Sequence, residues 1–219
     1  MLNPGKRTVI YLDSALVSEA QLVEKLGWVK GITTNPTLLA KSDLSPETTL
    51  QQLAQISPGE LYYQLTASEF DGMVAEGRKA FEIIGEKTVL KIPATSVGFQ
   101  VVAFLSREIP CAVTAIYSAA QAAVSREAGA NYAIAYVNRA TRLLGDGLAL
   151  VQDMASVLKG SNTEILAASL KSPEEAAAAL QAGAHHLTLP LSILQAMTTH
   201  LLSQQTVEEF NQTGRGLLG

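Results

Sequence analysis

Lys91 stands inside an otherwise apolar run that reads Val-Leu-Lys-Ile-Pro from position 89 to 93. If this run is a strand whose Leu90 and Ile92 face an apolar layer, alternation turns Lys91 to the opposite face, the interior of a barrel. Burial there favours the neutral amine over the ammonium ion. A neutral amine can attack a carbonyl carbon and form a Schiff base, so the run predicts covalent carbonyl chemistry. The alternative is a lysine paired with a buried carboxylate such as Asp13, or one whose amine reaches solvent.

Polar side chains that could support this chemistry stand at the ends of other apolar runs. Each of them alone also suits a helix cap or the edge of a core, so the prediction depends on their meeting in one place. They are Asp13; Thr33, Thr34 and Asn35; Gln64 and Thr66; Thr114; Tyr136, Asn138 and Arg139; and Ser169 with Lys171.

Metal and serine-nucleophile chemistry are disfavoured. Of the three histidines, His185 and His186 are adjacent and His200 lies far along the chain, a spacing unlike that of metal ligands. The chain has no Gly-x-Ser-x-Gly motif of a serine hydrolase. The one cysteine, Cys111, lies in an apolar run, and we interpret it as a packing residue. We therefore expect neither a metal nor a cofactor.

The elements that position these residues are short apolar runs alternating with amphipathic or alanine-rich stretches. The predicted strands are Val9–Asp13, Lys30–Thr34, Leu61–Thr66, Thr88–Pro93, Cys111–Ile116, Tyr132–Val137, Ile165–Ser169 and His186–Leu191. The predicted helices are Ser18–Leu26, Glu47–Ile56, Ser68–Ile84, Ser96–Glu108, Ser118–Ala128, Gly147–Leu158, Pro173–Ala182 and Ser192–Leu202, followed by a short extra helix at Val207–Gln212. Ser172, Pro173 and Glu175 form a predicted capping box.

Alternation of this kind is typical of a parallel sheet covered by helices. Eight units favour a closed α/β structure, a (β/α)8 TIM barrel that forms one domain over residues 1–219 with a short extra C-terminal helix. A doubly wound open sheet is the alternative, but no glycine-rich fingerprint follows the first strand, where the sequence is Asp-Ser-Ala-Leu. In a barrel the C-terminal strand ends meet on one face, which would gather the polar residues.

Composition excludes several classes of protein. The chain is 47% hydrophobic and 16% charged, which excludes a disordered chain. Its net charge of −4 argues against a nucleic-acid or anionic-membrane surface. No run approaches the roughly 20 apolar residues of a membrane-spanning helix, and no signal-peptide pattern opens the chain. We expect a cytoplasmic protein with small-molecule substrates and with neither nucleic acid nor a membrane as partner.

Short motifs along the chain occur in a familiar order. They are Tyr-Leu-Asp at 11–13, Thr-Thr-Asn-Pro at 33–36, Lys-Ile-Pro-Ala-Thr at 91–95, Thr-Ala-Ile-Tyr at 114–117, Tyr-Val-Asn-Arg at 136–139 and Ala-Ala-Ser at 167–169. Together they resemble the small transaldolase and fructose 6-phosphate aldolase family, from Tyr11 to about Leu191. The resemblance implies a (β/α)8 barrel that performs class I, Schiff-base aldol chemistry on ketose phosphates.

The resemblance also implies roles for the residues of the reaction itself. Lys91 would be the nucleophile on the C2 carbonyl, and Asp13 would assist proton transfer and hold substrate hydroxyls. Gln64 and Thr114 would position a water beside the imine carbon. Tyr136 would be the general acid/base on the hydroxyl whose deprotonation breaks the C3–C4 bond.

Substrate binding is implied in the same way. Thr33 and Asn35 would bind the dihydroxyacetone portion, and Arg139 with Ser169 would hold the phosphate of the other portion, for which a guanidinium has suitable geometry. The substrates would be sugar phosphates and small hydroxyketones or aldehydes.

Two positions separate the branches of this family. Transaldolases usually have a glutamate where this chain has Gln64 and a phenylalanine where it has Tyr136. An amide can orient a water but cannot relay its proton, so the phenol must do so. The resemblance thus favours a fructose 6-phosphate aldolase that releases dihydroxyacetone and glyceraldehyde 3-phosphate. The alternative is a transaldolase of the pentose phosphate pathway, which transfers the dihydroxyacetone unit to an aldose phosphate.

Other function classes stay open on the residues alone: a barrel that binds a sugar phosphate without catalysis, or an isomerase with Asp13 as its base. The chain also departs from the family pattern, with Leu170 where an aromatic residue is usual and Val97 where an acid is common. Relatives form ring-like assemblies, so the resemblance implies a ring-like homo-oligomer here, such as a decamer of two pentamers. The resemblance implies that Val207–Phe210 packs on a neighbouring copy.

Overall fold

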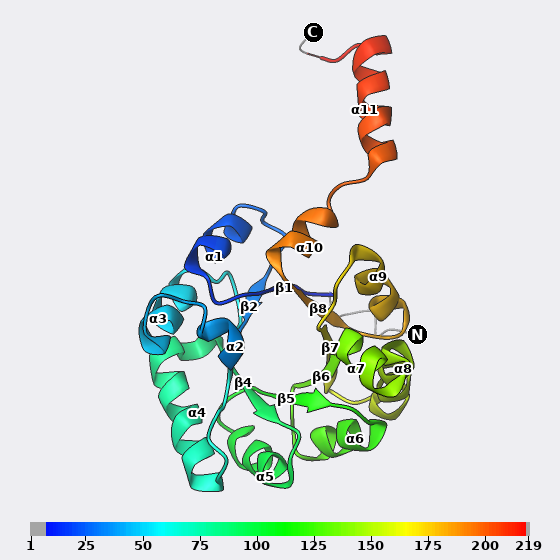
Figure 1. Cartoon of the computed structure of the whole chain (residues 1–219). Helices are drawn as coiled ribbons and strands as arrows, with labels where there is room; N and C mark the ends of the chain where they lie inside the picture. Colours follow the sequence, from blue (N-terminus) through cyan, green and yellow to red (C-terminus); the bar gives the residue numbers. More distant parts are fainter. Residues whose placement is uncertain (1–7, 218–219) are drawn as a thin grey trace.

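The computed structural model describes residues 8–217, and its strands form one closed barrel (Figure 1). The strands are β1 (Ile10–Asp13), β2 (Gly31–Thr33), β3 (Leu61–Gln64), β4 (Thr88–Pro93), β5 (Cys111–Ile116), β6 (Tyr132–Tyr136), β7 (Glu164–Ala168) and β8 (His186–Leu189). Every neighbouring pair is parallel, and β8 pairs with β1 to close the ring. The predicted (β/α)8 barrel is confirmed, and the open sheet is excluded.

Helices surround the barrel on its outside, except α11, which extends away from it (Figure 1). They are α1 (Val17–Glu24), α2 (Pro36–Leu39), α3 (Pro46–Ile56), α4 (Phe70–Ile84), α5 (Ser96–Leu105), α6 (Ala119–Glu127), α7 (Val137–Leu144), α8 (Gly147–Leu158), α9 (Pro173–Gln181), α10 (Leu191–Ala196) and α11 (Leu201–Thr213), with a short 3-10 turn, η1, at Gly85–Lys87. No helix within residues 8–217 combines the length and the apolar character that crossing a bilayer requires.

Two helices were not expected from the sequence. Asn35 caps α2 by accepting a hydrogen bond from the Leu38 backbone, with Pro36 at the first helical position. The second, α7, continues directly from β6 and ends at Gly145, whose φ of 95° lies in the left-handed region that glycine adopts readily. Asp146 then caps α8 through two backbone N–H groups.

The C-terminal end also differs from its prediction. The expected helix Ser192–Leu202 is divided into α10 and α11. The hydroxyls of Thr198 and Thr199 bond back to the carbonyls of Gln195 and Ala196, and His200 then caps α11. Local side-chain to backbone bonds of this kind compete with helix continuation, so the helix stops there.

Apolar packing divides into two regions. Alternate strand residues, Leu90 and Ile92 among them, face the helices and join the larger core. The other set, which includes Tyr62, Val89 and Ile134, fills the barrel interior. Because Val89 faces inward, alternation along β4 turns Lys91 inward as well, one layer nearer the C-terminal ends of the strands.

A carboxylate holds three tyrosines at the N-terminal end of the barrel, and we call this group the floor cluster: Glu60, Tyr11, Tyr62 and Tyr132. The tyrosine hydroxyls donate to Glu60 at 2.6, 3.1 and 2.8 Å respectively. Burial and the Glu60 carboxylate raise the pKa of Tyr11 and of Tyr132, and burial likewise raises the pKa of Tyr62. The floor cluster thus closes the barrel with protonated phenols.

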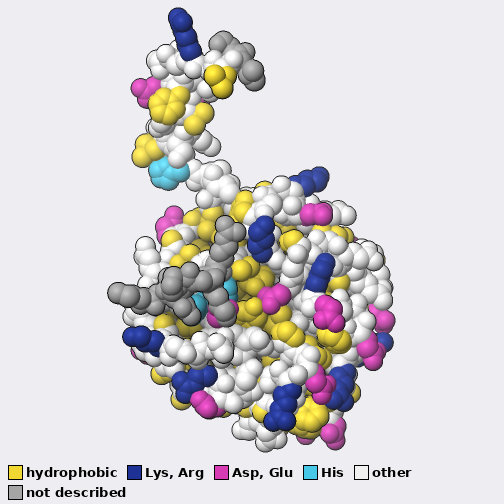
Figure 2. Space-filling model, turned by 180° about the vertical axis from the view of Figure 1, so that it is seen from behind, with side chains coloured by type: hydrophobic (Ala, Val, Ile, Leu, Met, Phe, Trp, Pro, Cys, Tyr) yellow, Lys and Arg dark blue, Asp and Glu magenta, His cyan; other side chains and the backbone are white. Residues whose placement is uncertain are grey.

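Helix α11 extends away from the barrel (Figure 1). None of its described residues is buried. Its apolar side chains lie on the surface, as the yellow groups on the arm in Figure 2 show. Leu201 and Phe210 are 66% and 65% exposed. An isolated helix with exposed apolar residues of this size is typical of a segment that packs against another surface.

Candidate active site

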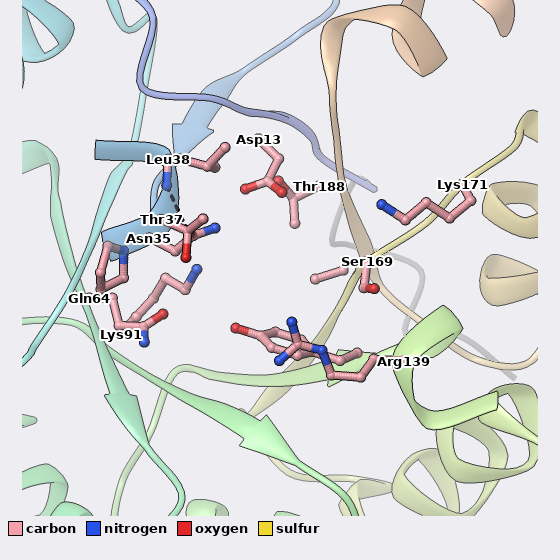
Figure 3. Close-up of a pocket in the computed structure, with 13 residues that line it drawn as sticks. Asp13, Asn35, Thr37, Leu38, Gln64, Lys91, Arg139, Ser169, Lys171 and Thr188 are labelled. Carbon is pink, nitrogen blue, oxygen red and sulfur yellow. Dashed lines mark hydrogen bonds between the residues drawn. The ribbon is translucent and has the colours of Figure 1, made fainter. Parts of the chain in front are cut away.

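An open cavity of about 380 Å³ lies at the C-terminal ends of the strands. Its lining combines carboxylate, amide, amine, phenol and guanidinium groups from separate strands (Figure 3). The predicted site residues that line it are Asp13, Asn35, Gln64, Lys91, Tyr136, Arg139 and Ser169. Thr33 and Thr114 do not line it and bond to lining residues from behind. The barrel therefore brings together the nine residues to which the resemblance gives roles. The side chains of Thr34, Thr66 and Asn138 bond elsewhere, to the Tyr62 carbonyl, Glu76 and Glu175 respectively.

Lys91 is the central group of the cavity. Its side chain is buried, with 3% of the residue exposed, and its Nζ donates to the backbone carbonyl of Thr34 at 2.8 Å. Burial lowers the pKa of Lys91, and the charge of Asp13 opposes this in part. Since the amine bonds to a neutral carbonyl and its pKa is lowered, a larger share of it is in the neutral form, which can act as a nucleophile.

Asp13 is held in place by two threonines. Thr33 donates to Asp13 Oδ1 at 2.9 Å, and the hydroxyls of Thr33 and Thr188 lie 2.6 Å apart. Because Thr33 has one hydroxyl proton and gives it to Asp13, Thr188 is the donor in the second bond. Thr188 was not predicted as a site residue, although it interrupts the apolar strand β8 much as Lys91 interrupts β4.

Tyr136 and Thr114 form a second hydrogen-bonded pair. Thr114 donates to the Tyr136 hydroxyl at 2.8 Å, which leaves the phenol proton available to the cavity. Burial raises the pKa of Tyr136, while the Thr114 bond and the Arg139 charge act to lower it. The β5–β6 register shifts between Val113 and Ile116, the segment that contains Thr114.

Gln64 brings an acceptor that the protein does not satisfy. Within the described part of the chain, no group donates to its buried Oε1. A buried acceptor without a donor is costly, so such an atom in a cavity wall is suited to a water or a substrate hydroxyl. Asn35 differs, because its Oδ1 accepts from Leu38 at 3.0 Å, as the dashed line in Figure 3 shows. Its amide Nδ2 is the group left to donate into the cavity.

Arg139, Ser169 and Lys171 lie together on the side of the cavity opposite Lys91 and Gln64 (Figure 3). Arg139 stacks over the Tyr136 ring at 5.3 Å, which fixes the guanidinium by a cation–π contact. Two cations and a hydroxyl in this arrangement suit an anion such as a phosphate. Lys171 was expected at a strand end but without a role; its position two residues after Ser169 was the available signal.

The fold resembles that of solved oxidoreductases. A mandelate oxidase crystal structure matches with a TM-score of 0.61 at 17% identity and covers 85% of this chain, which spans 65% of that one. Inosine 5′-monophosphate dehydrogenase from Legionella pneumophila matches with a TM-score of 0.60 at 13% identity, over 84% of this chain and 58% of that one. At these identities the likeness shows the fold alone.

Relatives in sequence are closer. Proteins named "Probable transaldolase" are each 33% identical to this chain: that of Shouchella clausii over 91% of this chain and 94% of its own length, that of Nitrosopumilus maritimus over 92% of both, and that of Thermoanaerobacter sp. over 94% and 96%. The family model described as "Transaldolase/Fructose-6-phosphate aldolase" matches residues 10–217. The chain therefore belongs to the transaldolase/fructose-6-phosphate aldolase family.

Proposed function

We propose that this protein is a class I aldolase that reversibly cleaves fructose 6-phosphate to dihydroxyacetone and glyceraldehyde 3-phosphate. The observation that supports this most directly is the buried amine of Lys91 in a cavity whose far side holds Arg139 and Lys171. A nucleophile at one end and cations at the other suit a phosphorylated carbonyl compound.

Binding would begin at the phosphate. Arg139, Ser169 and Lys171 hold this group, which directs the sugar chain across the cavity toward Lys91. Asp13 and Asn35 bind hydroxyls of the dihydroxyacetone portion, while Thr33 acts through Asp13 from behind the wall. The C2 carbonyl then lies at the Lys91 amine.

The covalent steps use Lys91 as an electron sink. Its amine adds to C2, water leaves, and an iminium ion forms. Removal of the C4 hydroxyl proton breaks the C3–C4 bond; its electrons form an enamine on Lys91 and glyceraldehyde 3-phosphate departs. Protonation of the enamine at C3 and hydrolysis release dihydroxyacetone and restore the amine. The C4 proton passes to the Tyr136 oxygen as the phenol gives its own proton to the water at Gln64, and the reverse relay supplies a proton to the aldehyde oxygen.

The transaldolase reaction is the alternative, and the names of the relatives favour it. It differs only in the fate of the enamine, which attacks a second aldehyde instead of being protonated. Gln64 and Tyr136 favour the aldolase, because the unsatisfied Oε1 of Gln64 can orient a hydrolytic water while the phenol carries the proton.

One assay separates the two activities: glyceraldehyde 3-phosphate release from fructose 6-phosphate, with and without erythrose 4-phosphate. Release without the acceptor supports the aldolase, and release only with it supports the transaldolase. In parallel, borohydride added during turnover should attach the substrate mass to Lys91. A folded Lys91→Met variant that still released glyceraldehyde 3-phosphate would rule out the imine mechanism.

We also propose that copies of the chain assemble through α11. The apolar side chains Leu201, Leu202, Val207 and Phe210 are each more than half exposed on a helix that touches little of its own barrel. The ring-like assemblies implied by the family resemblance give this helix a natural partner, which is a second copy of the chain.

The cytoplasm is the compartment we propose for this reaction. Cys111 is a free, buried thiol whose pKa is raised by burial to about 12, so it contributes no disulfide and no reactive thiolate. Fractionation of cells that express the tagged protein, with activity assayed in each fraction, tests this placement.

A further inference from the structure

Glu175, in the first turn of α9, bonds to two separate segments at the phosphate end of the cavity. Its Oε2 accepts from the backbone N–H of Lys171 at 2.6 Å, and its Oε1 accepts from the side-chain amide of Asn138 at 2.9 Å. Lys171 belongs to the loop after β7, and Asn138 precedes Arg139 on α7. One carboxylate thus joins the two segments that carry the cations.

This arrangement departs from the capping box that the sequence predicted. Ser172 does accept from the backbone N–H of Glu175 at 3.1 Å, which is half of the box. In the complete motif the glutamate side chain would return to the backbone N–H of the capping serine. Here the carboxylate instead reaches beyond its own helix, to Lys171 and Asn138. The Glu175 side chain therefore links α9 to α7 and to the loop after β7.

The loop that Glu175 holds is strained. Ser169 has a φ of 59°, in the left-handed region that is costly for residues other than glycine. Its carbonyl accepts from the Asn138 backbone at 3.2 Å. Together with the two Glu175 bonds, this contact closes a circuit from Ser169 through Asn138 and Glu175 to Lys171. A strained conformation persists only where its surroundings hold it, and this circuit supplies that hold.

We propose that Glu175 is a positioning residue that fixes the spacing of Arg139, Ser169 and Lys171 and thereby sets the affinity of the site for a substrate phosphate. This rests on the function proposed above. Charge and geometry then make opposite predictions. A carboxylate close to a phosphate repels it, so by charge alone the substitution Glu175→Gln would strengthen binding. If Glu175 acts by position, the same substitution weakens binding, because a glutamine has one acceptor oxygen and cannot accept from both Lys171 and the Asn138 amide.

The experiment compares Glu175→Gln with Glu174→Gln, which removes a neighbouring charge from the same turn of α9. Affinity for inorganic phosphate is measured by calorimetry, and kcat and KM are measured for fructose 6-phosphate cleavage. For Glu175→Gln we expect about tenfold weaker phosphate binding and a KM raised about tenfold, with kcat changed less than threefold. Glu174→Gln should leave the phosphate affinity and the KM unchanged. Borohydride trapping of unphosphorylated dihydroxyacetone on Lys91 should match the wild type in both variants.

A second variant tests the circuit itself. Asn138→Ala removes the same link from the other side, so its effect on phosphate affinity should not add to that of Glu175→Gln. The proposal would be overturned by tighter phosphate binding in Glu175→Gln, or by equal effects of Glu175→Gln and Glu174→Gln on phosphate affinity. It would also be overturned if Glu175→Gln lost dihydroxyacetone trapping to the same extent as phosphate binding. If the wild type cleaves no fructose 6-phosphate, the proposed activity fails, and the phosphate titration alone then decides the role of Glu175.

Discussion

At Lys91, burial and the Asp13 carboxylate act on one amine in opposite directions. Burial lowers the pKa, and the negative charge of Asp13 raises it, with burial the larger effect. The two threonines behind Asp13 keep its carboxylate in the position from which it has this influence. The pKa of the amine is therefore set mainly by its burial, with a smaller opposing effect of Asp13.

Replacing Asp13 by Asn should move the pH dependence of imine formation. Loss of the negative charge removes the effect that raises the pKa of Lys91, so the pKa falls further and the neutral amine persists at lower pH. The acidic limb of borohydride trapping with dihydroxyacetone should shift to lower pH, even if turnover falls. A shift to higher pH would contradict the electrostatic account.

The phenol of Tyr136 can be tested separately from imine formation. Tyr136→Phe keeps the ring over which Arg139 stacks but removes the proton carrier, so cleavage should slow by about 10²- to 10⁴-fold. Borohydride trapping of dihydroxyacetone should be retained, because that step uses Lys91. Tyr117→Phe, outside the cavity, serves as the matched control. Unchanged cleavage in Tyr136→Phe would remove the role assigned to this phenol.

Among the elements, the β3–α4 connection depends on one side chain. Glu76 of α4 accepts from the Tyr63 hydroxyl, from the backbone and hydroxyl of Thr66, and from the backbone of Ala67. Burial alone would raise the pKa of Glu76, but these bonds outweigh it and lower the pKa. The stabilisation is therefore present above the ordinary pKa of a glutamate and is lost as the pH falls through the lowered value.

Glu76→Ala should accordingly destabilise the protein by about 1–3 kcal/mol at neutral pH, since it leaves several donors without their acceptor. Glu82→Ala, on the exposed side of the same helix, is the control and should have little effect. Urea unfolding at pH 7 and pH 3 measures both variants. The difference between Glu76→Ala and the wild type should be smaller at pH 3, and an equal difference at both values would argue against the role of the charge.

Elements differed in how well the sequence predicted them. The strands were predicted because apolar residues face both the barrel interior and the helices. A strand such as β5 therefore reads as a continuous apolar run in the sequence. Helix α7 was missed because it follows β6 with no break, and its end depends on the backbone conformation of Gly145. At the site, alternation within β4 identified Lys91. The link through Glu175 could not be predicted, because it depends on the left-handed Ser169, which no local pattern indicates.

At the scale of the whole molecule, the floor cluster makes the stability of the folded protein depend on pH in the alkaline range. Tyr11, Tyr62 and Tyr132 have a raised pKa in the folded protein, whereas in the unfolded chain they lose their protons near pH 10. The folded state then binds more protons than the unfolded state, so stability falls as the pH rises above about 10. Three tyrosines give a slope of about 4 kcal/mol per pH unit.

Urea unfolding between pH 9 and pH 11 measures this slope. Replacing Tyr132 by Phe should lower it by about 1.4 kcal/mol per pH unit, the contribution of one phenol whose pKa is raised on folding. A slope that does not change in this variant would show that the floor cluster is not its source.

Assembly belongs to the same scale. Substitution of Phe210 by Glu places a charge on the apolar surface of α11, and we expect the mass measured by light scattering to fall toward 23.2 kDa, that of one chain. Thermal stability of the barrel should change little, since α11 has no buried residue. Glu209→Gln on the same helix is the control. A monomeric wild type, or an unchanged assembly in the Phe210 variant, would contradict the proposal.

The floor cluster also bears on the order in which the chain folds. Glu60 and Tyr132 are 72 positions apart, whereas the bond from the Val9 backbone to His186, where the ring closes, spans 177 positions. Contacts of long sequence separation cost more chain entropy, so they form later. We expect β1 through β6 to gather around Glu60 before β8 reaches β1. Pulse-labelling hydrogen exchange during refolding should then protect Tyr62 and Ile134 before Leu187.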